Sequence, residues 1–170
     1  MRVAIIGCGQ QGQYVARTLA KSDAISRLIV ADKFPEAAAK AAAKAGPKAT
    51  ASEVDVTDRK SLDAILEQAD IVFNGVGPFY KFFRGVVEAA IDHKVNYVDI
   101  NDDYDATDEL FSNSEYDRLA KNAGILVLSC IGETPGLSNL FAKYASQQME
   151  RTEAVHINFA YVYWRMLPAV

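Results

Sequence analysis

The chain has 170 residues, of which 50% are hydrophobic and 24% are charged, and its formal net charge at pH 7 is −4. This composition is typical of a globular chain that forms one domain, or one domain and the start of another. The mild acidity without a basic cluster argues against a nucleic-acid partner. No apolar run approaches the roughly 20 residues of a membrane span, and no signal peptide precedes the first predicted strand, so no membrane partner is expected.

The first twelve residues carry the strongest functional signal. Residues 2–6 are apolar and largely β-branched, which predicts a strand buried on both faces. The strand leads directly into Gly7, Gly9 and Gly12, and residues 13–21 have the apolar spacing of a helix. In this setting Gly7 allows the turn, Gly9 lets the backbone approach a pyrophosphate, and Gly12 lets the helix pack on the strand. The pattern predicts dinucleotide binding, with a purely structural glycine turn as the alternative.

A second strand, predicted for residues 26–31, ends in Asp32. Asp32 lies about 20 residues after Gly12, where a carboxylate accepts hydrogen bonds from the hydroxyl groups of an adenosine ribose. Asp32 would repel a 2′-phosphate and Lys33 would partly offset that repulsion, so NAD is the expected cofactor and NADP stays open. The cofactor-binding residues expected in this part of the chain are Gly7, Gly9, Gln10, Gln11, Gly12, Asp32 and Lys33.

The alternation of helices and strands continues with an alanine-rich helix at residues 35–45, a strand at 49–54 and a helix at 59–68. Asp55 or Val56, at the end of this strand, would contact the edge of the adenine. The alternative is that Asp55 only shapes the turn, and both interpretations stay open.

A second glycine-containing turn follows the fourth predicted strand, residues 71–73. In an open α/β sheet, ligands bind beyond the carboxyl ends of the strands, where the strand order switches. We therefore expect this turn beside the first glycine loop and against the ribose and nicotinamide half of the cofactor. The contacts expected from it are Asn74, Gly75, Val76, Gly77 and Pro78.

The fifth predicted strand, residues 95–100, runs into a polar cluster that contains Asp102 and Tyr104. Reactive groups often collect at strand ends, which makes these two residues the candidates for a catalytic role. The alternative is structural, because Asp102 and Asp103 suit the amino-terminal cap of a long helix predicted for residues 106–122.

Histidine and cysteine are scarce in this sequence. His93 and His156 lie far from each other and from Cys8 and Cys130, so no metal site or disulfide framework is expected. His93, at the end of a helix predicted for residues 82–93, is interpreted as a solvated residue. Cys130 is interpreted as an inert thiol at the end of a buried strand. The free cysteines indicate a reducing cytoplasm.

A sixth strand at residues 125–129 completes an α/β, Rossmann-type doubly wound parallel sheet of order 3-2-1-4-5-6 over residues 1–130. Residues 131–170 are expected to be the start of an incomplete substrate domain. They begin with a helix after Thr134-Pro135, whose amino terminus either binds an anionic group of the substrate or simply carries the chain outward. A strand at residues 152–163 is expected to fold back on the sheet or to pair with its copy in a homodimer.

The chain resembles the saccharopine dehydrogenase-like family over nearly its whole length. The motifs that carry the resemblance are Gly7-x-Gly9-x-x-Gly12, Val54-Asp-Val-Thr-Asp58, Asn74-Gly-Val-Gly-Pro-Phe-Tyr80, Tyr97-Val-Asp-Ile100 and Ile131-Gly-x-x-Pro135-Gly-Leu-x-x-Leu-Phe-Ala142. The resemblance implies an amino-terminal NAD(P)-binding domain, a following substrate domain, and hydride transfer to or from an imine of an amino acid or amine and an oxo acid. It also implies that the cofactor domain alone is inactive.

Two other functions remain open from the sequence. A non-catalytic module that binds or senses NAD would have the same fingerprint without turnover. A methyltransferase also has a glycine loop and an acidic residue after its second strand, but the spacing of all three glycines and the second glycine turn disfavour it.

Overall fold

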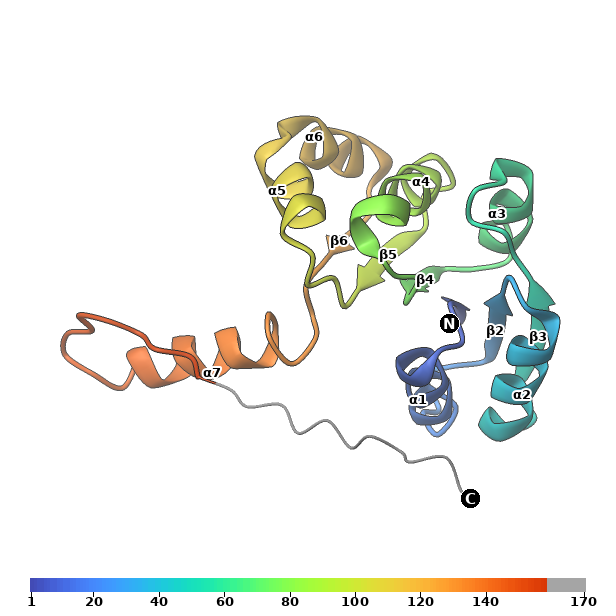
Figure 1. Ribbon diagram of the computed structural model, residues 1–170, viewed down its shortest axis with the longest axis horizontal. Coiled ribbons are helices and arrows are strands. Elements are labelled where there is room, and N and C mark those ends of the chain that lie inside the picture. Colours follow the sequence, from blue (N-terminus) through green and yellow to red (C-terminus); the bar gives the residue numbers. More distant parts are fainter. Residues whose placement is uncertain (159–170) are drawn as a thin grey trace, which may run out of the picture.

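The computed structural model describes residues 1–158, which form a single parallel sheet covered by helices on both faces (Figure 1). The strands are β1 (Arg2–Ile6), β2 (Arg27–Asp32), β3 (Ala49–Glu53), β4 (Ile71–Asn74), β5 (Asn96–Asp99) and β6 (Val127–Leu128). The helices are α1 (Gln10–Leu19), α2 (Pro35–Ala45), α3 (Arg59–Leu66), α4 (Phe79–Asp92), α5 (Tyr104–Ser112), α6 (Ser114–Ala123) and α7 (Leu137–Ser146). The strand order is β3-β2-β1-β4-β5-β6, which confirms the predicted doubly wound α/β fold.

The sheet separates two apolar layers, and β1 contributes to both. Val3 and Ile5 pack with α1 and α2 on one face, whereas Ala4 and Ile6 pack with α3 and α4 on the other. This alternation follows from the two-residue period of a strand. A short apolar run between two helical layers is therefore buried on both sides, as the sequence predicted.

The switch in strand order lies between β1 and β4. Ile6, the last residue of β1, is opposite Ala31 of β2 on one side and Asn74 of β4 on the other. The chain passes through β2 and β3 on one side and returns to β4 on the other, so the connections that follow β1 and β4 diverge. Such a divergence opens a crevice at the carboxyl ends of the two strands.

The single helix predicted for residues 106–122 is wrong, because two helices occupy this stretch. α5 ends and α6 begins at Asn113, which has extended backbone angles (φ −91°, ψ 98°). The Asn113 side chain accepts a hydrogen bond from the backbone N–H of Glu115 and so caps α6. An asparagine followed by an acidic first turn is a helix start signal, and here it interrupts the apolar periodicity.

Several other boundaries also differ from the predictions, most of them by one or two residues. α1 begins at Gln10 rather than at residue 13, and α4 begins at Phe79 rather than at residue 82. β6 contains only Val127 and Leu128, because it is an edge strand that pairs with β5 alone. Cys130 consequently lies beyond the strand, and it is partly exposed with a left-handed backbone (φ 63°).

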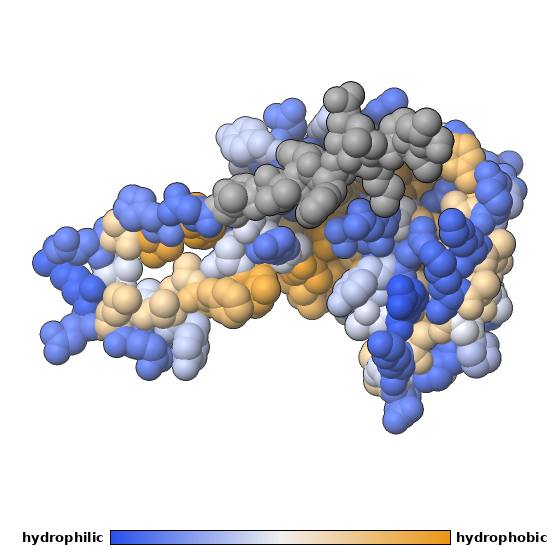
Figure 2. Space-filling model, turned by 60° about the horizontal axis from the view of Figure 1, so that its bottom comes forward, coloured by the Kyte–Doolittle hydropathy of each residue, from blue (hydrophilic) through white to orange (hydrophobic). Residues whose placement is uncertain are grey.

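The segment that follows β6 extends away from the sheet (Figure 1). α7 buries none of its residues, and Figure 2 shows apolar side chains over this projecting segment. Its large exposed side chains are Leu137, Leu140, Phe141 and Tyr144. Residues 152–158 have no regular secondary structure, so the strand predicted at 152–163 is wrong for this part. Residues 159–163 of that prediction lie outside the described residues.

The helices were also compared with the length and hydropathy that a membrane span requires. Within the described part of the chain, every helix is too short or too polar to cross a bilayer.

Candidate functional site

The two glycine turns lie in direct contact at the carboxyl ends of β1 and β4. Gly7 has a left-handed φ of +92°, and a Cβ at this position would lie 2.8 Å from both the carbonyl carbon and the oxygen of Gly75. The backbone N–H of Gly75 donates a hydrogen bond to the carbonyl oxygen of Ile6 at 2.8 Å. The predicted proximity of the two turns is therefore confirmed. Only glycine at residue 7 permits this approach.

The amino terminus of α1 offers backbone N–H groups to the space above these turns. Gly9 is the N-cap residue and provides no side-chain cap, and the first turn contains no acidic residue. A Cβ built at Gly9 would meet nothing within 4 Å. An open helix amino terminus with free donors and a partial positive charge fits a phosphate group.

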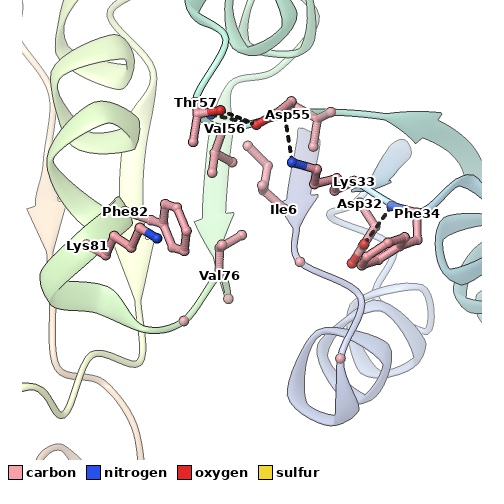
Figure 3. Close-up of a pocket in the computed structure, with 15 residues that line it drawn as sticks. Ile6, Asp32, Lys33, Phe34, Asp55, Val56, Thr57, Val76, Lys81 and Phe82 are labelled. Atoms are coloured by element: carbon pink, nitrogen blue, oxygen red, sulfur yellow. Dashed lines mark hydrogen bonds and ion pairs between the residues drawn. The ribbon is translucent and has the colours of Figure 1, made fainter.

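A cleft of about 490 Å³ joins these turns to the ends of β2 and β3 (Figure 3). This volume is in the range of cofactor and ligand pockets. Its lining residues are Ile6, Gly7, Gly9, Asp32, Lys33, Phe34, Val54, Asp55, Val56, Thr57, Gly75, Val76, Gly77, Lys81 and Phe82.

Asp32 connects the glycine loop to the end of β2. Its Oδ2 accepts a hydrogen bond from the backbone N–H of Cys8 at 2.6 Å, and its Oδ1 accepts one from the N–H of Phe34 at 3.0 Å. A carboxylate has about four acceptor sites, so Asp32 retains capacity for ribose hydroxyl groups. Burial, and then the Asp32 charge, raise the pKa of the Cys8 thiol to about 12. Cys8 is therefore a packing residue rather than a nucleophile.

Lys33 and Asp55 form an ion pair across the ends of β2 and β3. The Lys33 Nζ lies 3.0 Å from the Asp55 Oδ2. The other oxygen of Asp55 accepts hydrogen bonds from the backbone N–H of Thr57 at 2.9 Å and from its hydroxyl at 2.6 Å. These Thr57 bonds first, and Lys33 after them, lower the pKa of Asp55 to about 2.

This low pKa predicts a specific pH dependence. A depressed carboxylate pKa stabilises the fold above the ordinary value of 3.8, and the contribution is lost as the pH falls through about 2. We expect a carboxyl NMR titration of Asp55 with a midpoint near 2. In Lys33→Met the midpoint should rise but remain below 3.8, because the Thr57 hydrogen bonds are the larger cause. A midpoint at the ordinary value in Lys33→Met would show that the ion pair dominates instead.

Most of the residues predicted to bind the cofactor line this one cleft. They are Gly7, Gly9, Asp32, Lys33, Asp55, Val56, Gly75, Val76 and Gly77. The other five lie around it. Gln10 and Gln11 border a separate shallow groove on α1, and Gly12 is buried behind Gly7. Pro78 is the N-cap of α4, and Asn74 is fully buried.

Six residues that line the cleft were not singled out from the sequence. They are Ile6, Phe34, Val54, Thr57, Lys81 and Phe82. Lys81 and Phe82 lie in the first turn of α4 and face the cleft from the side opposite Lys33 (Figure 3). The Lys81 Nζ lies 5.2 Å from the centre of the Phe82 ring. They were missed because the helix was predicted to begin at residue 82, whereas α4 begins at Phe79 and brings its first turn to the cleft.

The residues considered for catalysis do not line the cleft. Asp102 is exposed, and Tyr104 is the first residue of α5 with 78% of its surface exposed. His93 ends α4 as predicted, but it is not a free solvated residue, because its Nε2 lies 2.7 Å from the Asp63 Oδ1. Among residues 1–158, no three His, Cys, Asp or Glu side chains are grouped closely enough to hold a metal ion.

A buried polar cluster lies beneath the second glycine turn, and Asp99 is its centre. Asp99 Oδ1 accepts hydrogen bonds from the Ser129 hydroxyl at 2.7 Å, the Cys130 N–H at 2.9 Å and the Asn101 N–H at 3.0 Å. Its Oδ2 accepts a bond from the Tyr97 hydroxyl at 2.7 Å. Asp99 stands in the motif Tyr97-Val-Asp-Ile100, but the sequence did not predict this cluster, because Ser129 and Cys130 come from a separate segment.

The cluster extends from Tyr97 to the second glycine turn. Asn74 Nδ2 donates a hydrogen bond to the Tyr97 hydroxyl at 3.0 Å, and Asn74 Oδ1 accepts one from the N–H of Val76 at 3.1 Å. Burial, and then the Asp99 charge, raise the pKa of Tyr97 well above its usual value, so its hydroxyl stays protonated and donates. Asn74 thus shapes the turn from below.

A family model described as "Saccharopine dehydrogenase NADP binding domain" matches residues 3–128. The yeast (Saccharomyces cerevisiae) protein named saccharopine dehydrogenase [NADP(+), L-glutamate-forming] is 32% identical over 151 residues, which are 88% of this chain and 31% of that protein. A Caenorhabditis elegans protein named lipid droplet localized protein is 29% identical over 133 residues, which are 73% of this chain and 31% of that protein.

Solved structures agree with these sequence matches. The apo yeast saccharopine dehydrogenase (L-Glu forming) superposes with a TM-score of 0.72 at 32% identity, over 86% of this chain and 31% of that chain. The chain thus spans about a third of the length of the relatives it matches.

Proposed function

Because the chain belongs to the family of saccharopine dehydrogenase NADP-binding domains, we propose that it is the cofactor domain of an oxidoreductase that acts on a carbon–nitrogen bond. The substrate class would be an amino acid or amine joined as an imine to an oxo acid. The observation that carries the proposal is the cleft formed by the two touching glycine turns, the open α1 terminus and Asp32.

The cleft suggests how a dinucleotide would lie. The open α1 terminus at Gly9 suits the pyrophosphate, and Asp32 suits the adenosine ribose. Val56 and Phe82, which lie side by side in Figure 3, provide apolar surface for the adenine. The Gly75 to Gly77 turn would hold the nicotinamide half.

The cofactor and the residues of this chain would contribute different parts of the reaction. The nicotinamide would supply or accept the hydride when bound. Residues of this chain would orient it: the Asp99 cluster supports the second glycine turn through Tyr97 and Asn74, and the amino terminus of α1 would partly offset the phosphate charge. We assign the proton transfer to a group that follows residue 130, in the substrate domain that we propose begins there, since Asp102 and Tyr104 lie away from the cleft lining.

We also propose NAD as the preferred cofactor. Asp32 and Asp55 are both at the ribose end of the cleft, and Lys33 is already paired with Asp55. A 2′-phosphate would therefore meet net negative charge.

Replacement of Asp32 tests the proposed site. In calorimetric titrations, Asp32→Ala should bind NADH at least about tenfold more weakly than the unaltered chain, because a charge-assisted contact to the ribose is lost. Asp23→Ala, an exposed acid distant from the cleft, is the matched control and should bind as the unaltered chain does. If the unaltered chain binds neither NADH nor NADPH, the proposed function fails. Preferential binding of S-adenosylmethionine would favour the methyltransferase instead.

A non-catalytic NAD-binding or sensing module is the second candidate, because Asp102 and Tyr104 are absent from the cleft lining. A full-length relative that binds NADH yet shows no turnover with any amino acid and oxo acid pair would favour it. The homodimer and the cytoplasmic location expected from the sequence stay predictions.

A further inference from the structure

The charged side chains of the cleft are unevenly distributed. Asp32, Lys33 and Asp55 lie at the ends of β2 and β3, whereas Lys81 lies on the opposite wall beside Phe82 (Figure 3). The 2′ position of an adenosine ribose is recognised next to the residue that ends the second strand. Lys33 is therefore the nearest cation in sequence to that position, and its pairing decides whether it is available for a phosphate.

Asp55 is a fixed partner for Lys33. Two hydrogen bonds from Thr57 hold one carboxylate oxygen, which leaves the other directed at the Lys33 Nζ 3.0 Å away. Asp55 has 36% of its side-chain surface exposed and Lys33 has 66%. The lysine is thus the flexible member of the pair, and the carboxylate is the anchored one.

We propose that Asp55 determines the preference of this cleft for NAD over NADP, because it holds Lys33 away from the 2′ position and adds a second negative charge beside Asp32. This inference rests on the proposed function and names a residue that selects between the two cofactors. Lys33 in itself is a suitable phosphate ligand, since a lysine acts as a point charge on a long stem. The ion pair with Asp55 keeps the Lys33 ammonium group away from the 2′ position.

The size of the effect follows from the exposure of the pair. Exposed ion pairs are weak, so a 2′-phosphate can compete for Lys33, but the anchored Asp55 charge remains and still repels it. Removal of that charge should therefore raise the affinity for NADPH relative to NADH by about tenfold, the scale of one partly screened charge contact.

The experiment is a double-mutant cycle measured by calorimetric titration of the full chain with NADH and with NADPH. Asp55→Asn retains an acceptor oxygen for Thr57, and Asp55→Ser is a second variant that also retains one. Both should raise the NADPH-to-NADH affinity ratio about tenfold, and the added change Lys33→Met should reduce the increase to the part that comes from removal of the Asp55 charge. Glu53→Gln is the matched control, because Glu53 is exposed, lies opposite Asp32 across the β2–β3 pair, and forms no ion pair within residues 1–158.

Distinct outcomes would overturn the inference. An unchanged affinity ratio in both Asp55 variants, with NADH binding retained, rejects the role of Asp55 while the proposed function stands. An equal increase in Glu53→Gln attributes the preference to general charge rather than to Asp55. An increase of the same size with and without Lys33→Met rejects the role of Lys33. If the unaltered chain binds neither NADH nor NADPH, the proposed function itself fails.

Discussion

Gly12→Ala is expected to lower the free energy of unfolding by about 3 kcal/mol or more. A Cβ at Gly12 would overlap the carbonyl oxygen of Gly7 and lie 3.0 Å from its carbonyl carbon. Both obstructing atoms belong to the backbone of the first glycine turn, so no side-chain rotation relieves the overlap. Urea unfolding monitored by circular dichroism should show a markedly lower midpoint or no cooperative transition.

Gly9→Ala is the matched control, since the same methyl group is added three residues away. Gly9 has an ordinary φ of −62°, and its Cβ would meet nothing within 4 Å. Its stability should change by about 1 kcal/mol at most, the scale of an altered N-cap residue. NADH affinity should nevertheless fall at least about tenfold, because the methyl group enters the space proposed for the pyrophosphate. Normal stability of Gly12→Ala would contradict the close contact of α1 with the turn.

Asp99→Ala is expected to destabilise the fold by at least about 3 kcal/mol. Asp99 is fully buried, and its removal would leave the Tyr97 hydroxyl and two backbone N–H groups without this acceptor, and the Ser129 hydroxyl with only the Cys130 Sγ at 3.6 Å. Each buried donor without a partner costs about 1–3 kcal/mol, and several such donors would arise together. Thermal and urea unfolding of the variant should both report the loss.

Asp23→Ala provides the comparison, because it removes an exposed carboxylate and should change stability by about 0.5 kcal/mol or less. Asp99→Ala should also weaken NADH binding, since the Asn74 side chain that supports the second glycine turn is held through Tyr97. An Asp99→Ala protein as stable as Asp23→Ala would show that the buried cluster does not organise the strand ends.

The single helix predicted for residues 106–122 shows how a local signal in the sequence, the helix cap at Asn113, can be overlooked. The sequence predicted one helix over residues 106–122, yet Asn113 caps a new helix within that range. The apolar period reports which face is buried, whereas the cap depends on one side chain and one backbone N–H. The sequence analysis therefore predicted helical structure here and missed the break at Asn113.

The parallel sheet, its strand order, the adjacency of the two glycine turns and the family could all be predicted from the amino-acid sequence. These features depend on apolar periodicity and on residues spaced along one local strand–turn–helix unit, such as Gly7, Gly9 and Gly12. The side chains that meet across the cleft became visible only in the folded chain. The Lys33–Asp55 pair, the position of Lys81 opposite it, and the bonds from Asp99 to Ser129 join separate segments. Such contacts form only when packing brings the carboxyl ends of different strands to one edge, and their distances are not encoded in any local pattern.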